Sequence, residues 1–221
     1  NSIFNSADLG FTVGGLLGEK LDDDYQKKVS KKYPGKYGSF AFGVYNGGGY
    51  HAAEQNEDKV IESRISLRPL GFVLPHWQVS HVLVHGKGNT PEEPDWDLNA
   101  FLTSFEHQYF VVTAQLGFGE GNQKGDKLED DGSAMDLFGY SFFGEVKLPF
   151  IHSSLIGRYD YFDWGTDGGK SPTRRIIAGH AFHFLPHNFI LASLDRVDYL
   201  DEGVPTDQQA KLTLQIKFPA K

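Results

Sequence analysis

The C-terminal part of the chain alternates between polar and apolar side chains. From Lys211 to Phe218, one set of positions holds Lys, Thr, Gln and Lys, and the other holds Leu, Leu, Ile and Phe. Successive side chains of an extended strand point to opposite faces, so this pattern predicts a β-strand with one apolar face.

The same alternation recurs along the whole chain, which indicates an antiparallel all-β fold. The clearest case runs without interruption from Phe110 to Gly119. In three segments, 76–86, 173–184 and 188–199, the pattern is imperfect, and we expect β-bulges there. Eleven segments are predicted as strands, near residues 7–17, 37–47, 60–69, 76–86, 99–106, 109–119, 135–148, 154–163, 173–184, 188–199 and 210–218.

The length and polarity of these segments favour a transmembrane β-barrel. Strands of soluble proteins usually have about 5–6 residues, whereas a tilted strand that crosses a bilayer needs roughly 9–11. Several segments are of the longer kind. Their less apolar positions hold Gly, Ser, Thr, Gln, Arg and Lys, which suits a water-filled lumen. A soluble antiparallel sandwich or a lipocalin-like binder is the alternative interpretation.

The connections between the segments differ in length. Short links are expected at 70–75, 107–108, 149–153 and 185–187, and long polar links at 48–59, 87–98, 120–134, 164–172 and 200–209. Outer-membrane barrels have short periplasmic turns and longer extracellular loops, so the long links should face outward. Residues 18–36 are a long exception on the short-turn side. They are predicted to hold a helix from Asp22 to Lys32, acidic at its start and basic at its end.

The odd number of predicted strands bears on the domain organisation. Bacterial single-chain barrels have an even number of strands. The odd count implies either a missed strand or a truncated N-terminus, and we interpret residues 1–221 as a single outer-membrane β-barrel domain that lacks its N-terminal strands. At roughly 20 residues for each strand and loop, a sixteen-stranded barrel would lack about five strands, or on the order of 100 residues.

Composition excludes several classes of function. The chain has no Cys, so it has no disulfide and no Cys-based metal or redox site. A net charge of -8 argues against a nucleic-acid partner. Neighbouring Ser80 and His81 face opposite sides of a strand and cannot form a catalytic dyad. His81 and His85 share a face but lie about 13 Å apart, too far to ligate one metal ion. We expect no enzymatic activity, no metal site and no cofactor.

Six motifs occur in this order along the chain: Asp8–Gly10, Tyr37–Gly47, Glu62–Pro69, Gly157–Asp163, Arg174–Gly179 and Lys211–Phe218. In this order they resemble the phosphate-selective porin (O/P-type) family over nearly the whole chain and correspond to the C-terminal two thirds of its barrel. The resemblance implies a sixteen-stranded, trimeric diffusion channel for anions. The chain departs from the family in two ways: it lacks the N-terminal strands, which build much of the constriction in that family, and three residues follow Phe218. Phosphate selectivity is therefore not carried over to this chain.

An anion channel needs cationic side chains in its lumen, because these replace part of the hydration of a passing ion. Each candidate could instead be paired with a neighbouring carboxylate such as Glu145 or Asp160, and both interpretations stay open. Arg175 is expected at an exposed rim. The candidate pore-lining and anion-binding residues are Arg64, Arg68, Arg158, Lys147, Lys211 and Lys217.

Carboxylates cluster in the predicted outer loops, for example Glu92, Glu93, Asp95 and Asp97. They could bind divalent cations that bridge lipopolysaccharide, favour cation uptake, or be solvated loop charge.

The sequence as a whole predicts a passive porin in the outer membrane of a Gram-negative bacterium. Its expected partners are small anionic solutes, outer-membrane lipid and lipopolysaccharide, and two further copies in a homotrimer. The alternative function is a structural or interaction barrel that sheathes a partner protein or an electron carrier.

Overall fold

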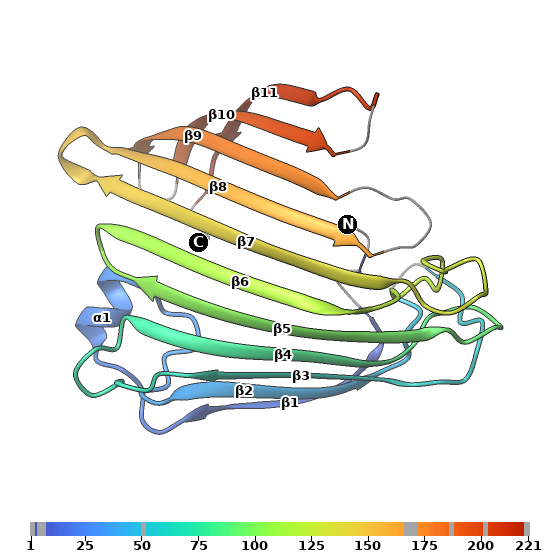
Figure 1. Ribbon diagram of the computed structural model, residues 1–221. Coiled ribbons are helices and arrows are strands. Elements are labelled where there is room, and N and C mark those ends of the chain that lie inside the picture. The colour runs from blue at the N-terminus through green and yellow to red at the C-terminus, as the bar shows by residue number, and fades with distance from the viewer. Residues whose placement is uncertain are drawn as a thin grey trace.

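Eleven strands form one antiparallel sheet, and each strand pairs with the next along the chain (Figure 1). The computed structural model describes residues 3, 8–49, 52–165, 172–185, 188–200 and 203–218. The predicted all-β fold is confirmed. The strands are β1 (Gly10–Leu17), β2 (Gly38–Tyr45), β3 (Val60–Leu67), β4 (Trp77–Lys87), β5 (Asp95–Glu106), β6 (Phe110–Glu120), β7 (Asp136–Leu148), β8 (Ser153–Trp164), β9 (Thr173–Leu185), β10 (Asn188–Tyr199) and β11 (Asp207–Gln215).

The sheet is curved but open. Figure 1 shows it as a trough, with β1 at one margin and β11 at the other. These two strands do not pair with each other, so the strands that the structure describes form no closed barrel. No helix within the described ranges is long and apolar enough to cross a bilayer.

The two faces of the sheet differ in chemistry, as the alternation predicted. Residues that are directly opposite in neighbouring strands point to the same side of a sheet. Phe40, Ile65 and Phe101 follow one another in this way, through His81, on the convex face. Apolar side chains of this face are widely exposed, among them Phe101 at 48% and Phe142 at 54%. The intervening positions line the concave face and hold mostly small, polar and charged residues.

Several strand boundaries differ from the predicted ones, most clearly those of β5 and β11. β5 begins at Asp95 instead of residue 99, because Trp96 and Leu98 pair with β4 and are buried. β11 covers Asp207–Gln215, so the predicted end at Phe218 is wrong. The register between β9 and β10 shifts where β9 advances two residues, from Leu185 to His183, against one in β10, which confirms a bulge at the end of β9. β4 pairs without interruption on both sides.

The ends of the trough carry different connections. The short turns, with the 3-10 helix η1 (Pro149–Ile151), lie at the end that holds α1 (Asp23–Lys28), and the long loops lie at the other end (Figure 1). The Asp22 side chain caps α1 by accepting a hydrogen bond from the Tyr25 N–H at 2.7 Å. The helix ends well before the predicted Lys32. The chain turns back after α1, because Pro34 and Gly35 pair with Leu21 and Lys20.

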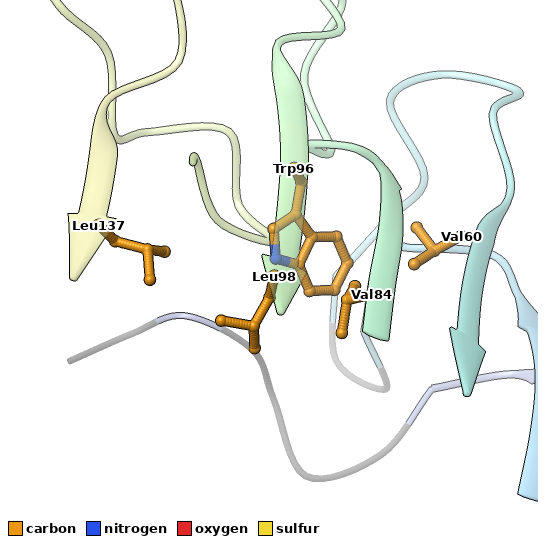
Figure 2. Packing of buried hydrophobic residues seen from close by; sticks show 5 residues of the cluster. All are labelled: Val60, Val84, Trp96, Leu98 and Leu137. Atoms are coloured by element: carbon orange, nitrogen blue, oxygen red, sulfur yellow. The ribbon is translucent and has the colours of Figure 1, made fainter. Parts of the chain in front are cut away.

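An apolar cluster lies on the concave face towards the loop end (Figure 2). It consists of Val60, Val84, Trp96, Leu98 and Leu137, and Trp96 is 0% exposed. Ile3, Phe162 and Trp164 pack against it. The concave face is therefore filled by apolar side chains at this end, which the sequence did not predict because Trp96 was assigned to a loop.

Candidate functional site

Four of the six predicted cations share the concave face of the sheet. Arg64 lies on β3, Lys147 on β7, Arg158 on β8 and Lys211 on β11. The register places each on the side that carries the polar positions. Lys217 lies beyond the end of β11, where its backbone N–H donates a hydrogen bond to the Asn188 side chain.

Arg68 is placed differently from the prediction. It follows the last residue of β3 and is only 5% exposed. Its Nη1 donates to the carbonyl oxygens of Tyr33 and Gly35 at 3.1 and 2.7 Å, and its Nε donates to the carbonyl of Pro75 at 3.0 Å. The guanidinium therefore joins two segments of backbone and does not present its charge to the concave surface.

The concave face of β8 to β11 carries a ladder of paired charges. Arg158 Nε donates to Asp160 at 2.8 Å. Arg175 donates two hydrogen bonds to the Asp195 carboxylate, at 2.8 and 2.6 Å, and Lys211 Nζ donates a third at 2.8 Å. For Arg158 and Lys211, the alternative of pairing with a carboxylate is therefore confirmed.

Asp195 is the centre of this ladder. Its side chain is 8% exposed, and two cations compensate its charge. Arg175, which was expected at an exposed rim, lies on the concave face directly opposite Asp160. Three cations and two carboxylates leave the ladder with a formal charge of +1. Pairing within the ladder removes most of the local charge and fixes the side chains against neighbouring strands.

Arg64 and Lys147 differ from the ladder residues in their environment. Neither takes part in an ion pair with any residue that the structure describes. The Arg64 guanidinium lies over the ring of Tyr33, 4.1 Å from its centroid, and Nη2 is 3.4 Å from Ser39 Oγ. Arg64 therefore keeps its full charge on the concave face.

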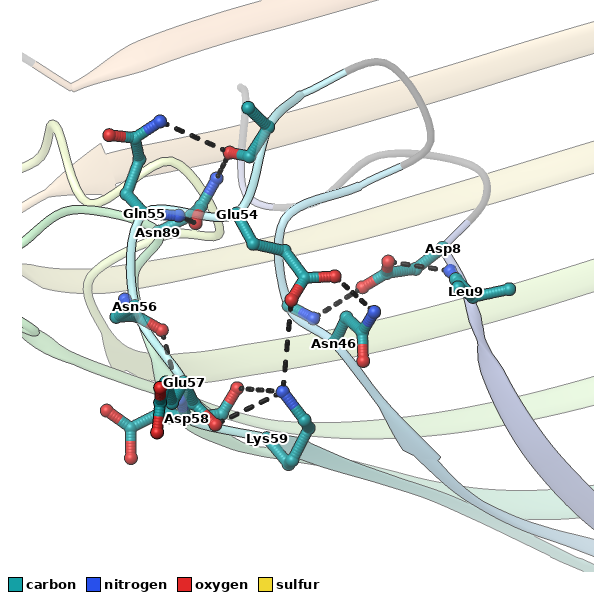
Figure 3. Close-up of polar contacts among 12 residues, drawn as sticks. Asp8, Leu9, Asn46, Glu54, Gln55, Asn56, Glu57, Asp58, Lys59 and Asn89 are labelled. Carbon is teal, nitrogen blue, oxygen red and sulfur yellow. Dashed lines mark hydrogen bonds and ion pairs between the residues drawn. The ribbon is translucent and has the colours of Figure 1, made fainter.

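Some of the carboxylates in the loops form hydrogen bonds and ion pairs with other loop residues. Figure 3 shows Glu54 accepting a hydrogen bond from Asn46 and pairing with Lys59 at 4.0 Å. Asp8 accepts from the Gly47 N–H at 2.7 Å. The Glu54 contacts lie within the connection between β2 and β3, and the Asp8 contact joins this connection to the chain that precedes β1.

A second group of carboxylates lies on the convex face near the loops. Asp97, Glu120 and Asp136 are opposite one another on β5, β6 and β7 and border a hollow of about 450 Å³. His85 Nδ1 lies 2.5 Å from the Asp97 carboxylate. Asp97 was expected in a loop but belongs to β5. In the described part of the chain, no three His, Asp or Glu side chains are arranged to hold a metal ion.

The proposed separation of Ser80 from His81 is confirmed. Ser80 Oγ donates to Ser66 Oγ at 2.8 Å on the concave face. His81 Nε2 lies 3.1 Å from Asn99 Oδ1 on the convex face.

Sequence reasoning missed Tyr33 and Asp195. The signal for Asp195 was present in the short turn between β9 and β10, which fixes the register and brings Arg175 and Asp195 to the same face. No comparable signal existed for Tyr33, because its contact with Arg64 depends on how a long connection folds.

Comparison with known proteins gave no relative: no family model, no curated protein and no solved structure matches this chain.

Proposed function

We propose that this chain forms the wall of an outer-membrane porin that passes small anions by passive diffusion. The main support for this proposal is a sheet of long strands with an apolar convex face and a polar concave face. Its strands have 8 to 13 residues, and most are long enough for a tilted crossing of a bilayer core of about 30 Å. Exposed aliphatic and aromatic side chains on the convex face suit lipid, and polar side chains on the concave face suit water.

Individual cations on the concave face, rather than its net charge, support a preference for anions. Arg64 and Lys147 lie on this face outside the ion pairs of the described residues, and the ladder from β8 to β11 adds a formal charge of +1. Four further carboxylates share the face and offset these charges, namely Glu62, Glu106, Glu145 and Asp207. The anion preference therefore depends on where Arg64 and Lys147 lie along the pore, and not on the net charge of the face. Cationic side chains along a pore attract anions and replace part of their hydration without holding them tightly.

The complete assembly belongs to the same proposal. A closed pore requires further strands between β1 and β11, because these edges do not pair. The resemblance of six sequence motifs to phosphate-selective porins supports a sixteen-stranded barrel, a homotrimer and a location in the outer membrane of a Gram-negative bacterium, beside lipopolysaccharide.

Planar-bilayer recording tests this function. The protein is refolded in detergent and added to a bilayer that separates two KCl concentrations. We expect stepwise currents and a reversal potential of the sign set by chloride. Flotation with lipid vesicles checks insertion in parallel. Protein that floats with vesicles but gives no current would contradict the porin and favour a structural barrel that sheathes a partner.

A further inference from the structure

The connection between β1 and β2, residues 18–37, is an ordered element at the short-turn end of the trough. Lys20 and Gly35 form an antiparallel bridge, and the Leu21 N–H donates to the Pro34 carbonyl at 2.7 Å. Leu21 and Tyr25 are each 7% exposed. The Tyr25 ring on α1 lies 5.3 Å from the ring of His76. The connection is thus packed against the turn that precedes β4.

Arg68 fixes the position of this connection relative to the sheet. Its guanidinium binds carbonyl oxygens on both sides, those of Tyr33 and Gly35 in the connection and that of Pro75 in the turn. A charged donor strengthens each of these hydrogen bonds, and a buried guanidinium is costly unless its donors are used. The backbone at Tyr33 is therefore held near the end of β3.

This arrangement brings the Tyr33 ring onto the concave face. The ring lies under the Arg64 guanidinium, at 4.1 Å from Cζ to the ring centroid. Ser39 and Ser66 lie on the same face of β2 and β3, and each is 1% exposed. The concave face of β2 and β3 beside Arg64 is thus covered at the short-turn end.

The contact with Tyr33 orients Arg64 without neutralising it. A guanidinium over an aromatic face is attracted by the ring quadrupole and keeps its edge N–H groups for other partners. Residues 29–37 contain Lys31, Lys32 and Lys36 and no carboxylate. Glu62, two residues before Arg64 on the same face of β3, is the nearest opposing charge along that strand. The part of the connection that contacts Arg64 therefore contributes cations and no carboxylate.

We infer that residues 18–37 fold into the trough as a constriction, and that Arg64, oriented by Tyr33, determines the charge selectivity of the pore at that point. Arg68 acts as a positioning residue that holds the constriction against the sheet. The inference rests on the proposed porin function for its electrical consequence, but the folded-in connection stands on the contacts alone.

Electrical recording tests the role of Arg64. Arg64→Gln should lower the anion-to-cation permeability ratio by about three-fold, because one unit charge is removed beside the ion path. Arg64→Lys should retain most of the ratio. Tyr33→Ala should raise the single-channel conductance by widening the passage. Arg196→Gln, which removes the same charge from the convex face, is the matched control. An equal effect of Arg64→Gln and Arg196→Gln would overturn the inference.

Thiol labelling tests the connection without any current. The chain has no Cys, so Ser39→Cys introduces a single thiol. We expect slow reaction with a water-soluble maleimide, and at least about ten-fold faster reaction when Arg68→Gln is added, because loss of the carbonyl contacts opens the cover. Gln115→Cys, on the exposed concave face of β6, should react quickly in both backgrounds.

The two measurements separate the two proposals. If Ser39→Cys reacts as fast as Gln115→Cys with Arg68 in place, the folded-in connection is overturned. If Ser39→Cys is protected but the inserted protein passes no current, the porin function is overturned while the folded-in connection is supported.

Discussion

Asp195 compensates two cations on the concave face of β9 to β11. One carboxylate, almost buried, accepts hydrogen bonds from both Arg175 and Lys211. These two cations lie on β9 and β11, on either side of β10, and would otherwise repel each other across the face. The residue thus has two effects: it stabilises the pairing of three strands, and it lowers the positive potential of the concave face beside it.

Replacement of this carboxylate should increase anion selectivity. Asp195→Asn keeps the shape and part of the hydrogen bonding but leaves Arg175 and Lys211 uncompensated. We expect the anion-to-cation permeability ratio to rise by about two- to three-fold, measured from the reversal potential in a KCl gradient. Asp198→Asn makes the same charge change on the convex face of β10, where Asp198 pairs with Arg196 at 2.9 Å. An equal change in both variants would contradict the assignment.

At the scale of single residues, the alternation along a strand predicted the face of the sheet on which a side chain lies, but not the residue with which it pairs. The alternation was sufficient to place Arg64, Arg158, Lys147 and Lys211 on one side of the sheet. The alternation gave the wrong position for Arg68, because this residue follows the end of β3 and its side chain no longer belongs to one face of the sheet. Ion pairs depend on the register between strands, which a single sequence leaves undetermined where turns are long.

At the scale of elements, the entrance to β2 depends on a glycine. Gly38 has a φ of +131°, and a Cβ added there would lie 1.9 Å from the carbonyl oxygen of Ser66. An L-residue rarely adopts this backbone, and the contact leaves no room on the β3 side. The connection from α1 into β2 therefore requires glycine at this position.

Gly38→Ala should destabilise the protein by about 2 kcal/mol or more, as expected for a strained backbone with a steric clash. Gly157→Ala is the matched control, since nothing lies within 4 Å of a Cβ built on Gly157. Urea unfolding of the protein in lipid vesicles, followed by tryptophan fluorescence, measures both variants. Equal midpoints for Gly38→Ala and the unchanged protein would show that the entrance to β2 is less restricted than these contacts indicate.

The packing of α1 should depend on pH through Tyr25. Burial raises the pKa of the Tyr25 hydroxyl above its ordinary value of 10, against the opposing effect of Arg68. A raised pKa in the folded state means that its contribution to stability is complete below about pH 10 and is lost as the pH rises through the raised pKa. The difference in tyrosinate absorbance between the protein and Tyr25→Phe should show one phenol that ionises later than an exposed tyrosine. A transition at the ordinary pH would contradict the burial of this ring.

Elements were predicted well where alternation was strict and poorly at their ends. The β6 segment was expected at 109–119 and is found at Phe110–Glu120. β11 was placed three residues too late, because its first residues, Asp207–Gln209, are polar on both faces and give no apolar signal. They nevertheless pair with Asp195 to Val197 of β10. Backbone pairing, which requires no apolar side chain, decided this boundary.

At the scale of the whole molecule, the open edges are as informative as the faces. β1 and β11 each have one neighbour, and every residue of β11 is exposed. Unpaired strand edges present rows of free N–H and C=O groups, and a bilayer core offers no water to satisfy them. A membrane location therefore requires that both edges pair with further strands, which connects the proposed location to barrel closure.

The orientation of the sheet towards lipid can be tested with two adjacent residues of β6. Leu116 lies on the convex face at 39% exposure, opposite Phe101 and Tyr140, and Gln115 is exposed on the concave face. An Arg on a lipid-facing position near the bilayer centre costs about 2–4 kcal/mol, whereas a lumen position accepts it. Leu116→Arg should lower the urea midpoint of unfolding from lipid vesicles, and Gln115→Arg should leave it almost unchanged and raise anion selectivity. Both variants add the same charge one residue apart, so net charge and local sequence cannot account for a difference. Equal stability of the two variants would place the convex face in water or against protein, and the porin proposal would lose its principal support.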